Sequence, residues 1–130
     1  MTAITVRGLR KSYGALEAVR GVDFDIESGE VFGLLGPNGA GKTTTVEILE
    51  GYRERDGGDV AVLGNDPQKP GPDFRQRIGV VLQQSELFPN LTVREVHRTF
   101  AGYYRRPRDV DEVIDLVGLD EKRGTRVKHL

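Results

Sequence analysis

Residues 36–43 read Gly-Pro-Asn-Gly-Ala-Gly-Lys-Thr, which matches the phosphate-binding pattern G-x-x-x-x-G-K-[ST] at every fixed position. The glycines allow the backbone to approach phosphate oxygens, and successive N–H groups then form a nest for an anion. Lys42 supplies a full positive charge for the terminal phosphates, so it is a candidate catalytic residue. The hydroxyl of Thr43 is the expected metal ligand. The pattern therefore predicts a site for a nucleoside triphosphate with Mg2+.

The segments on either side of this loop support the same interpretation. Residues 31–35 are apolar on both faces, as in a central strand of a parallel sheet. Residues 41–50 have a helical pattern, which Gly51 ends. A helix that begins at the loop directs unpaired N–H groups and its positive dipole end at the phosphates. The alternative is a glycine-rich turn that binds nothing. The candidate nucleotide contacts in this segment are Asn38, Gly39, Ala40, Gly41, Lys42, Thr43 and Thr44.

The other patterns predict an α/β chain. Alternating apolar residues indicate a strand that begins near residue 4 and a second strand over 22–26, where two aspartates give the wet face of an antiparallel strand. Further strands are expected at 59–63 and 78–82, with a short helix at 73–77 between them. The predicted core is thus a parallel sheet preceded by an antiparallel β part.

The last third of the chain has helical patterns. Thr92 and Glu95 form a capping box, which predicts a helix that ends before Pro107. Asp109 caps a second helix, which Gly118 closes. Apolar stripes are expected on both helices, the first formed by Val93, Val96, Phe100 and Tyr103 or Tyr104. We therefore expect a β-rich nucleotide-binding core over residues 1–89 and the beginning of a helical subdomain over 90–130.

Composition narrows the class of protein. The chain has 130 residues, a formal net charge of −1 and no cysteine. These values exclude disulfides and a strongly basic nucleic-acid-binding surface. No apolar run approaches the roughly 20 residues that span a bilayer, and the N-terminus lacks the pattern of a signal peptide. The sequence therefore favours a cytoplasmic protein that reaches a membrane only through a partner.

Beyond the phosphate loop, the chain resembles the ATP-binding domain of ABC transporters. The likeness extends over nearly the whole sequence, in the same order and with similar spacing. Within the family, the chain is most similar to the exporter-associated group, which includes drug-resistance and ABC-2-type pumps. The segments that carry the likeness are residues 9–14, 18–19, 22–26, 28–44, 57–60, 63–64, 77–83 and 87–95.

The resemblance implies roles for three residues outside the phosphate loop. Tyr13 would stack on adenine, although a core or turn tyrosine is the simpler alternative. Val19 would lie near the ribose, or it is an ordinary core valine. Gln83 would reach the metal or the attacking water and would thus have both a metal-binding and a catalytic role. A solvent-facing glutamine remains the alternative, and Gln84 is adjacent.

The resemblance also implies a complete protein that hydrolyses ATP to drive transport, most naturally export. Such a protein has a transmembrane permease partner, forms a head-to-tail dimer with a second ATP-binding domain, and lies on the cytoplasmic face of the membrane. The sequence contains neither an apolar strand that ends in Asp and Glu nor the Leu-Ser-Gly-Gly-Gln signature. The likeness therefore covers about the first half of the family's domain, and the chain is expected to be truncated.

Two alternatives to the transport ATPase remain. In the first alternative, the 130-residue chain is a nucleotide-binding module without hydrolytic activity. It is otherwise a different P-loop enzyme, such as a GTPase or a small-molecule kinase. The absence of the guanine motif Asn-Lys-x-Asp argues against the GTPase.

Overall fold

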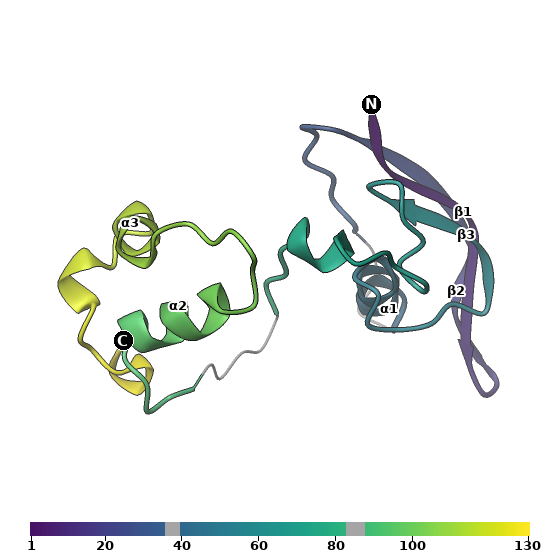
Figure 1. The fold of residues 1–130 in the computed structure, drawn as a ribbon. Coiled ribbons are helices and arrows are strands. Elements are labelled where there is room, and N and C mark those ends of the chain that lie inside the picture. Colours follow the sequence, from purple (N-terminus) through teal and green to yellow (C-terminus); the bar gives the residue numbers. More distant parts are fainter. Residues whose placement is uncertain (36–39, 83–87) are drawn as a thin grey trace. The chain divides into compact units, whose positions relative to one another are not determined.

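The computed structural model describes residues 1–35, 40–82 and 88–130. The chain forms two compact units, Met1–Val80 and Val81–Leu130, while the functional boundary expected after residue 89 stays a prediction. Figure 1 shows the elements in chain order. They are β1 (Thr2–Tyr13), β2 (Leu16–Glu27), α1 (Ala40–Leu49), β3 (Gly57–Val62), the 3-10 helix η1 (Phe74–Gln76), α2 (Val93–Ala101), α3 (Val110–Leu116), and the 3-10 helices η2 (Asp120–Lys122) and η3 (Val127–His129).

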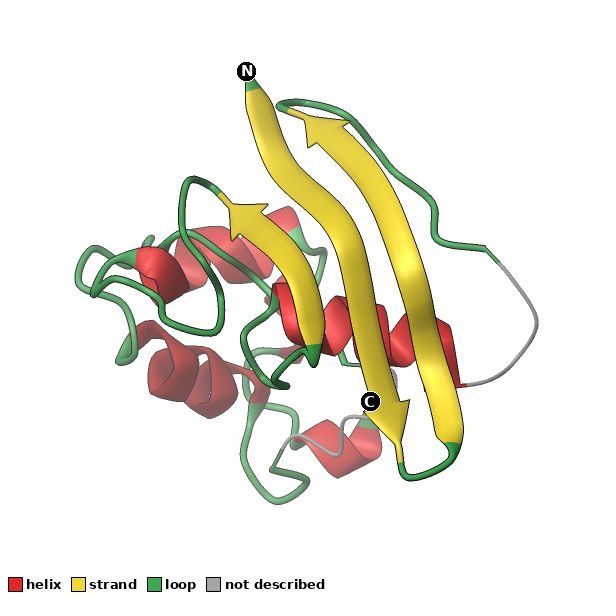
Figure 2. Ribbon diagram, turned by 90° about the vertical axis from the view of Figure 1, so that its right-hand side faces the viewer, coloured by secondary structure: helices red, strands yellow, loops and turns green. Residues whose placement is uncertain are grey.

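The first unit contains a three-stranded antiparallel sheet in the order β2-β1-β3. Gly14 and Ala15 form the tight turn between β1 and β2. Helix α1 crosses behind β1 and β2 in Figure 2 and so covers one face of the sheet. The expected antiparallel β part is therefore confirmed, and its face toward α1 carries the core.

A bulge in β1 brings two core residues to the same face. Val6 and Leu9 are both fully buried, although strict alternation would place residues three apart on opposite faces. The pairing with β2 shifts register between these two residues. Gly8 has φ +59° there, a conformation that costs glycine little, and its N–H donates to Asp23 Oδ1 at 2.5 Å. The bulge therefore interrupts the alternation of side chains between the two faces of the sheet, and both apolar side chains face α1.

The core of the first unit joins the sheet to α1 and η1. Seven buried apolar side chains form one cluster, and their burial supplies the main driving force for folding this unit. They are Val6, Leu9, Val19, Ile48, Val60, Val62 and Phe74. Because Ile48 lies in α1, this cluster fixes the helix against the sheet.

Two predicted strands, a central strand of a parallel sheet over residues 31–35 and a further strand over 78–82, are not paired as strands. Residues 31–35 and 78–82 lie outside every strand that the structure describes. Val31 is 99% exposed and Val81 is 98% exposed, so the prediction that these segments are buried on both faces is wrong for this chain. The physical reason is that a strand satisfies its N–H and C=O groups only through neighbouring strands. Apolar composition alone does not provide those neighbours.

In the second unit, the helices begin at the caps that the sequence predicts. Thr92 Oγ1 accepts from the N–H of Glu95 at 3.2 Å, and the Glu95 carboxylate accepts from the N–H of Thr92 at 2.8 Å, which completes the capping box of α2. The Asp109 side chain likewise caps α3. Val93, Val96 and Ile114 are buried.

The apolar stripe expected on α2 is buried only in its first half. Phe100 is exposed, and Tyr103 and Tyr104 are exposed residues beyond the end of α2 at Ala101, which corrects the prediction that they continue the stripe on this helix. The short unit has few elements to cover them, although Phe100 contacts Phe88 and Tyr103 through ring pairs with centroids 6.4 and 5.9 Å apart. Among the described residues, no helix has the length and apolar character to cross a bilayer.

An ion pair in the first unit makes its stability depend on pH. Both guanidinium Nη atoms of Arg55 donate to the Asp66 carboxylate, at 2.7 and 2.8 Å, and these hydrogen bonds lower the pKa of Asp66 from 3.8 to about 2. A lowered folded-state pKa means that the pair stabilises the fold above about pH 4 and loses this contribution as the pH falls toward 2. Because the Asp66 side chain is 39% exposed, solvent screening limits the contribution.

We expect Asp66→Asn to lower the free energy of unfolding at pH 7 by about 0.5–1 kcal/mol. The difference from the unaltered chain is expected to shrink as the pH falls from about 4 toward 2, because Asp66 is then protonated in the unfolded state and becomes protonated in the folded state as well. Urea denaturation at a series of pH values measures this. Glu54→Gln removes an exposed carboxylate from the same region and serves as the control. A difference that persists unchanged at pH 2 would contradict the assignment to the ion pair.

Candidate nucleotide-binding site

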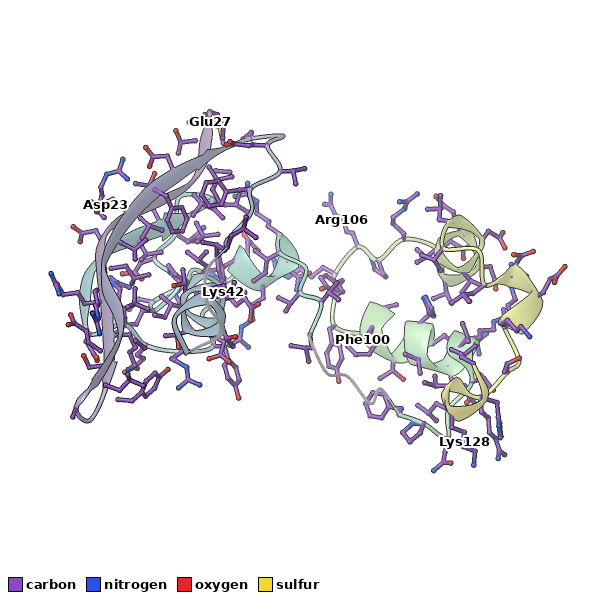
Figure 3. All side chains as sticks on the ribbon, turned by 180° about the vertical axis from the view of Figure 1, so that it is seen from behind. Asp23, Glu27, Lys42, Phe100, Arg106 and Lys128 are labelled. Carbon is purple, nitrogen blue, oxygen red and sulfur yellow. The ribbon has the colours of Figure 1, made fainter. Side chains whose placement is uncertain are left out.

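The N-terminus of α1 carries the part of the phosphate loop that the structure describes. Lys42 is half-buried and Thr43 is exposed in the first turn, and Figure 3 labels Lys42 on this helix. No acidic residue occupies the first turn, so no carboxylate there opposes an anion at the positive end of the helix dipole. A lysine, an exposed hydroxyl and the N–H groups at the positive end of a helix fit a polyphosphate with a bound cation.

Gly41 has a structural role beside the role expected at the phosphates. A Cβ atom at this position would lie 2.8 Å from the carbonyl oxygen of Ala18 in β2. The absence of a side chain therefore lets the first turn of α1 approach the sheet closely. This approach is what brings the beginning of the helix near the end of β1.

The two threonines that follow Thr43 face the protein interior. Thr44 is 3% exposed, and its Oγ1 lies 3.2 Å from the hydroxyl oxygen of Tyr13, within hydrogen-bonding distance. Thr45 is also buried, and its hydroxyl donates to the carbonyl of Gly41 at 2.7 Å. The role expected for Thr44 at a phosphate stays a prediction, and its observed contact is with Tyr13.

Tyr13 lies at the end of β1 and is 37% exposed. Lys11 Nζ lies over its ring at 5.6 Å from the centroid, and Arg53 Cζ lies over it at 5.3 Å. Both distances are within the range of a cation–π interaction. Tyr13 is thus a partly exposed residue whose hydroxyl lies within hydrogen-bonding distance of Thr44 in the phosphate-loop helix. This arrangement allows one ligand to contact the ring and the helix terminus together.

Arg53 and Lys11, the two residues that lie over the Tyr13 ring, were not identified from the sequence. Arg53 is held by Glu47, whose carboxylate accepts from Nε at 2.5 Å and raises the pKa of the guanidinium. Lys11 pairs with Asp56 at 3.3 Å. No spacing rule connects Arg53 with Tyr13, because the two lie on elements that meet only in the folded chain.

The structure describes Val19 fully but not the other predicted nucleotide contacts that remain. Val19 is 2% exposed and belongs to the core cluster, and its expected position near the ribose stays a prediction. Asn38, Gly39 and Gln83 lie outside the described residues. Ala40 begins α1, but its side chain is not described either. The roles expected for these residues stay predictions.

A magnesium ion at this site would rely on few protein ligands. Within residues 1–35, 40–82 and 88–130, no group of three or more acidic or histidine side chains could hold a metal ion. The exposed hydroxyl of Thr43 fits one position of an octahedral Mg2+ shell. The ion ordinarily completes such a shell with water and substrate phosphates.

Comparison with known proteins gives the family. The model of the ABC transporter family matches residues 19–130. The fluoroquinolones export ATP-binding protein of Mycobacterium tuberculosis is 41% identical over 127 residues, which cover 95% of this chain and 42% of that protein. The Nod factor export ATP-binding protein I of Burkholderia orbicola is 43% identical over 132 residues, covering 98% of this chain and 43% of that protein. The linearmycin resistance ATP-binding protein of Bacillus subtilis is 34% identical over 130 residues, covering 96% of this chain and 42% of that protein.

A solved structure confirms the fold class. The ADP conformation of an ATP-binding cassette from an ABC transporter matches with a TM-score of 0.77 at 21% identity, covering 100% of this chain and 59% of that chain. At this identity the match shows the fold alone. The chain spans less than half the length of the curated relatives named above, all of which are named for export or drug resistance. By its match to the family model over residues 19–130, this chain belongs to the ABC transporter family.

Proposed function

We propose that this chain binds ATP with Mg2+ as the nucleotide-binding part of an ABC export transporter. The hydrogen-bonding contact of 3.2 Å between the Tyr13 and Thr44 hydroxyls carries the proposal. It connects a partly exposed aromatic ring, suited to stacking on a base, with the helix turn that contains Lys42 and Thr43. A nucleotide is a ligand with a flat base and phosphates in one molecule.

In this proposal each group has a separate task. Lys42 and the N–H groups at the beginning of α1 bind the phosphates, and Thr43 holds the magnesium ion by its hydroxyl. The ion neutralises phosphate charge when it is bound. Tyr13 stacks on adenine, while Asn38 and Gln83 contribute from segments outside the described residues.

The experiment compares ATP with inorganic tripolyphosphate, which has the phosphates but no base. Isothermal titration calorimetry in the presence of Mg2+ is expected to give a dissociation constant about ten-fold lower for ATP, because base stacking on an aromatic side chain contributes about 1–3 kcal/mol. Tyr13→Ala is expected to remove this difference and leave tripolyphosphate binding unchanged. Equal affinities of the unaltered chain for the two ligands would contradict the base site.

For the complete protein, we propose an ATPase whose hydrolysis drives export through a transmembrane permease partner. A head-to-tail dimer on the cytoplasmic face of the membrane belongs to the same proposal. The names of the relatives support this direction, since they are ATP-binding proteins of fluoroquinolone export, Nod factor export and linearmycin resistance.

A second candidate function applies to the 130-residue chain itself: nucleotide binding without turnover. It is favoured by the sequence, which has no apolar strand ending in Asp and Glu to supply the second metal anchor and orient water. Phosphate release from ATP by the purified chain is then expected to equal that of buffer. Magnesium-dependent release that Lys42→Ala abolishes would contradict this candidate and support hydrolysis by the chain alone.

A further inference from the structure

Arg53 is attached to α1 by two hydrogen bonds to the same residue. Its backbone N–H donates to the carbonyl of Glu47 at 3.2 Å, and its Nε donates to the Glu47 carboxylate at 2.5 Å. The two side chains are 34% and 24% exposed. A charge-assisted bond to a partly shielded carboxylate restricts the planar guanidinium more than a bond in open solvent would. Arg53 is therefore oriented by the helix that also carries Lys42.

The guanidinium of Arg53 lies over the ring of Tyr13, with Cζ 5.3 Å from the centroid. The Tyr13 hydroxyl lies within hydrogen-bonding distance of Thr44, which precedes Glu47 by three residues in the same helix. Thr44 in α1 thus contacts the hydroxyl of Tyr13, and Arg53 in the turn after α1 lies over its ring. Two such attachments limit rotation of the side chain and fix the plane in which it can stack.

We infer that Arg53, oriented by Glu47, is a positioning residue that holds the Tyr13 ring for stacking with the adenine base. This inference rests on the proposed function. Tyr13 as a residue is 37% exposed, so part of it stays accessible to a base although Arg53 and Lys11 both lie over its ring. A ring that is already held loses less conformational freedom on binding, and that preorganisation raises affinity for the base without affecting the phosphates.

The test measures ATP and tripolyphosphate binding by Arg53→Ala, Arg53→Lys and the unaltered chain with Mg2+ in titration calorimetry. Arg53→Ala is expected to raise the dissociation constant for ATP about three- to five-fold and to leave that for tripolyphosphate unchanged. Arg53→Lys keeps a cation that can lie over the ring and is expected to recover part of the ATP affinity. Glu47→Gln weakens the anchor and is expected to have a smaller effect in the same direction. Arg75→Ala removes an exposed arginine from the same unit and serves as the matched control.

The other possible outcomes would each overturn the inference about Arg53. Equal losses for ATP and tripolyphosphate would mean that Arg53 is only structural, and ATP binding that is unchanged or tighter in Arg53→Ala would mean that it does not position the ring. Either result overturns the inference and leaves the proposed function intact. An unaltered chain that binds no ATP would overturn the proposed function and the inference with it.

Discussion

Lys42→Ala is expected to raise the dissociation constant for ATP by about 100-fold, because the change removes the only full positive charge in the first turn of α1 as the structure describes it. Hydrogen bonds to charged groups contribute about 1.5–3 kcal/mol each. The helix dipole, at about 0.3–1 kcal/mol per nearby charge, cannot replace them. Titration calorimetry with ATP and with tripolyphosphate measures the effect, and both ligands are expected to be affected alike.

Lys69→Ala is the matched control, since it removes the same charge from an exposed loop of the first unit. It is expected to change neither dissociation constant. A similar loss in both variants would indicate a general electrostatic effect of the chain. Unchanged ATP binding in Lys42→Ala would contradict the phosphate site itself.

Gly58→Ala is expected to lower the free energy of unfolding of the first unit by more than about 3 kcal/mol. Gly58 has φ +88°, and a Cβ atom there would lie 2.5 Å from the carbonyl oxygen of Arg7 and would also overlap that of Gly8. These are backbone atoms at the bulge of β1, so they cannot move aside as the end of a side chain can. Relief of the overlap requires β3 to separate from β1, which exposes Val60 and Val62 of the core.

Gly64→Ala separates the effect of the overlap from that of the backbone angle. Gly64 has φ +77°, but a Cβ atom there would meet nothing within 4 Å. This variant is expected to cost only about 1–2 kcal/mol, the strain of the left-handed conformation. Urea denaturation followed by circular dichroism measures both variants. Equal destabilisation would show that conformation, and not the close approach of β3 to β1, is what requires glycine at position 58.

Local signals in the sequence predicted the helices well. The pattern that begins at the phosphate loop predicted α1, and the bonds between Thr92 and Glu95 confirm the predicted start of α2. A helix cap depends on side chains and N–H groups only a few residues apart, so the sequence contains all the participants. The antiparallel strands were predicted only in part: the alternating pattern indicated a strand from near residue 4 and another over 22–26, whereas β2 extends from Leu16 to Glu27 and pairs with β1 through a tight turn.

Non-local pairing could not be predicted in the same way. Residues 31–35 and 78–82 have the composition of buried strands, yet they are unpaired in the described structure. Hydrophobic composition indicates which side chains a strand would bury. The hydrogen bonds of a strand depend instead on which other segments lie beside it. The bulge at Gly8 is likewise a property of three strands together, since it shifts the register of β1 against both β2 and β3.

By itself, the sequence predicted a phosphate site and the roles of Lys42 and Thr43 in it, because both residues belong to a motif of contiguous residues. Only the tertiary structure decided that Val19 is part of the core and that Arg53 lies over Tyr13. The contact between Arg53 and Tyr13 depends on where the end of β1 and the turn after α1 place two backbones. That placement results from the packing of the helix on the sheet, and no local pattern specifies it.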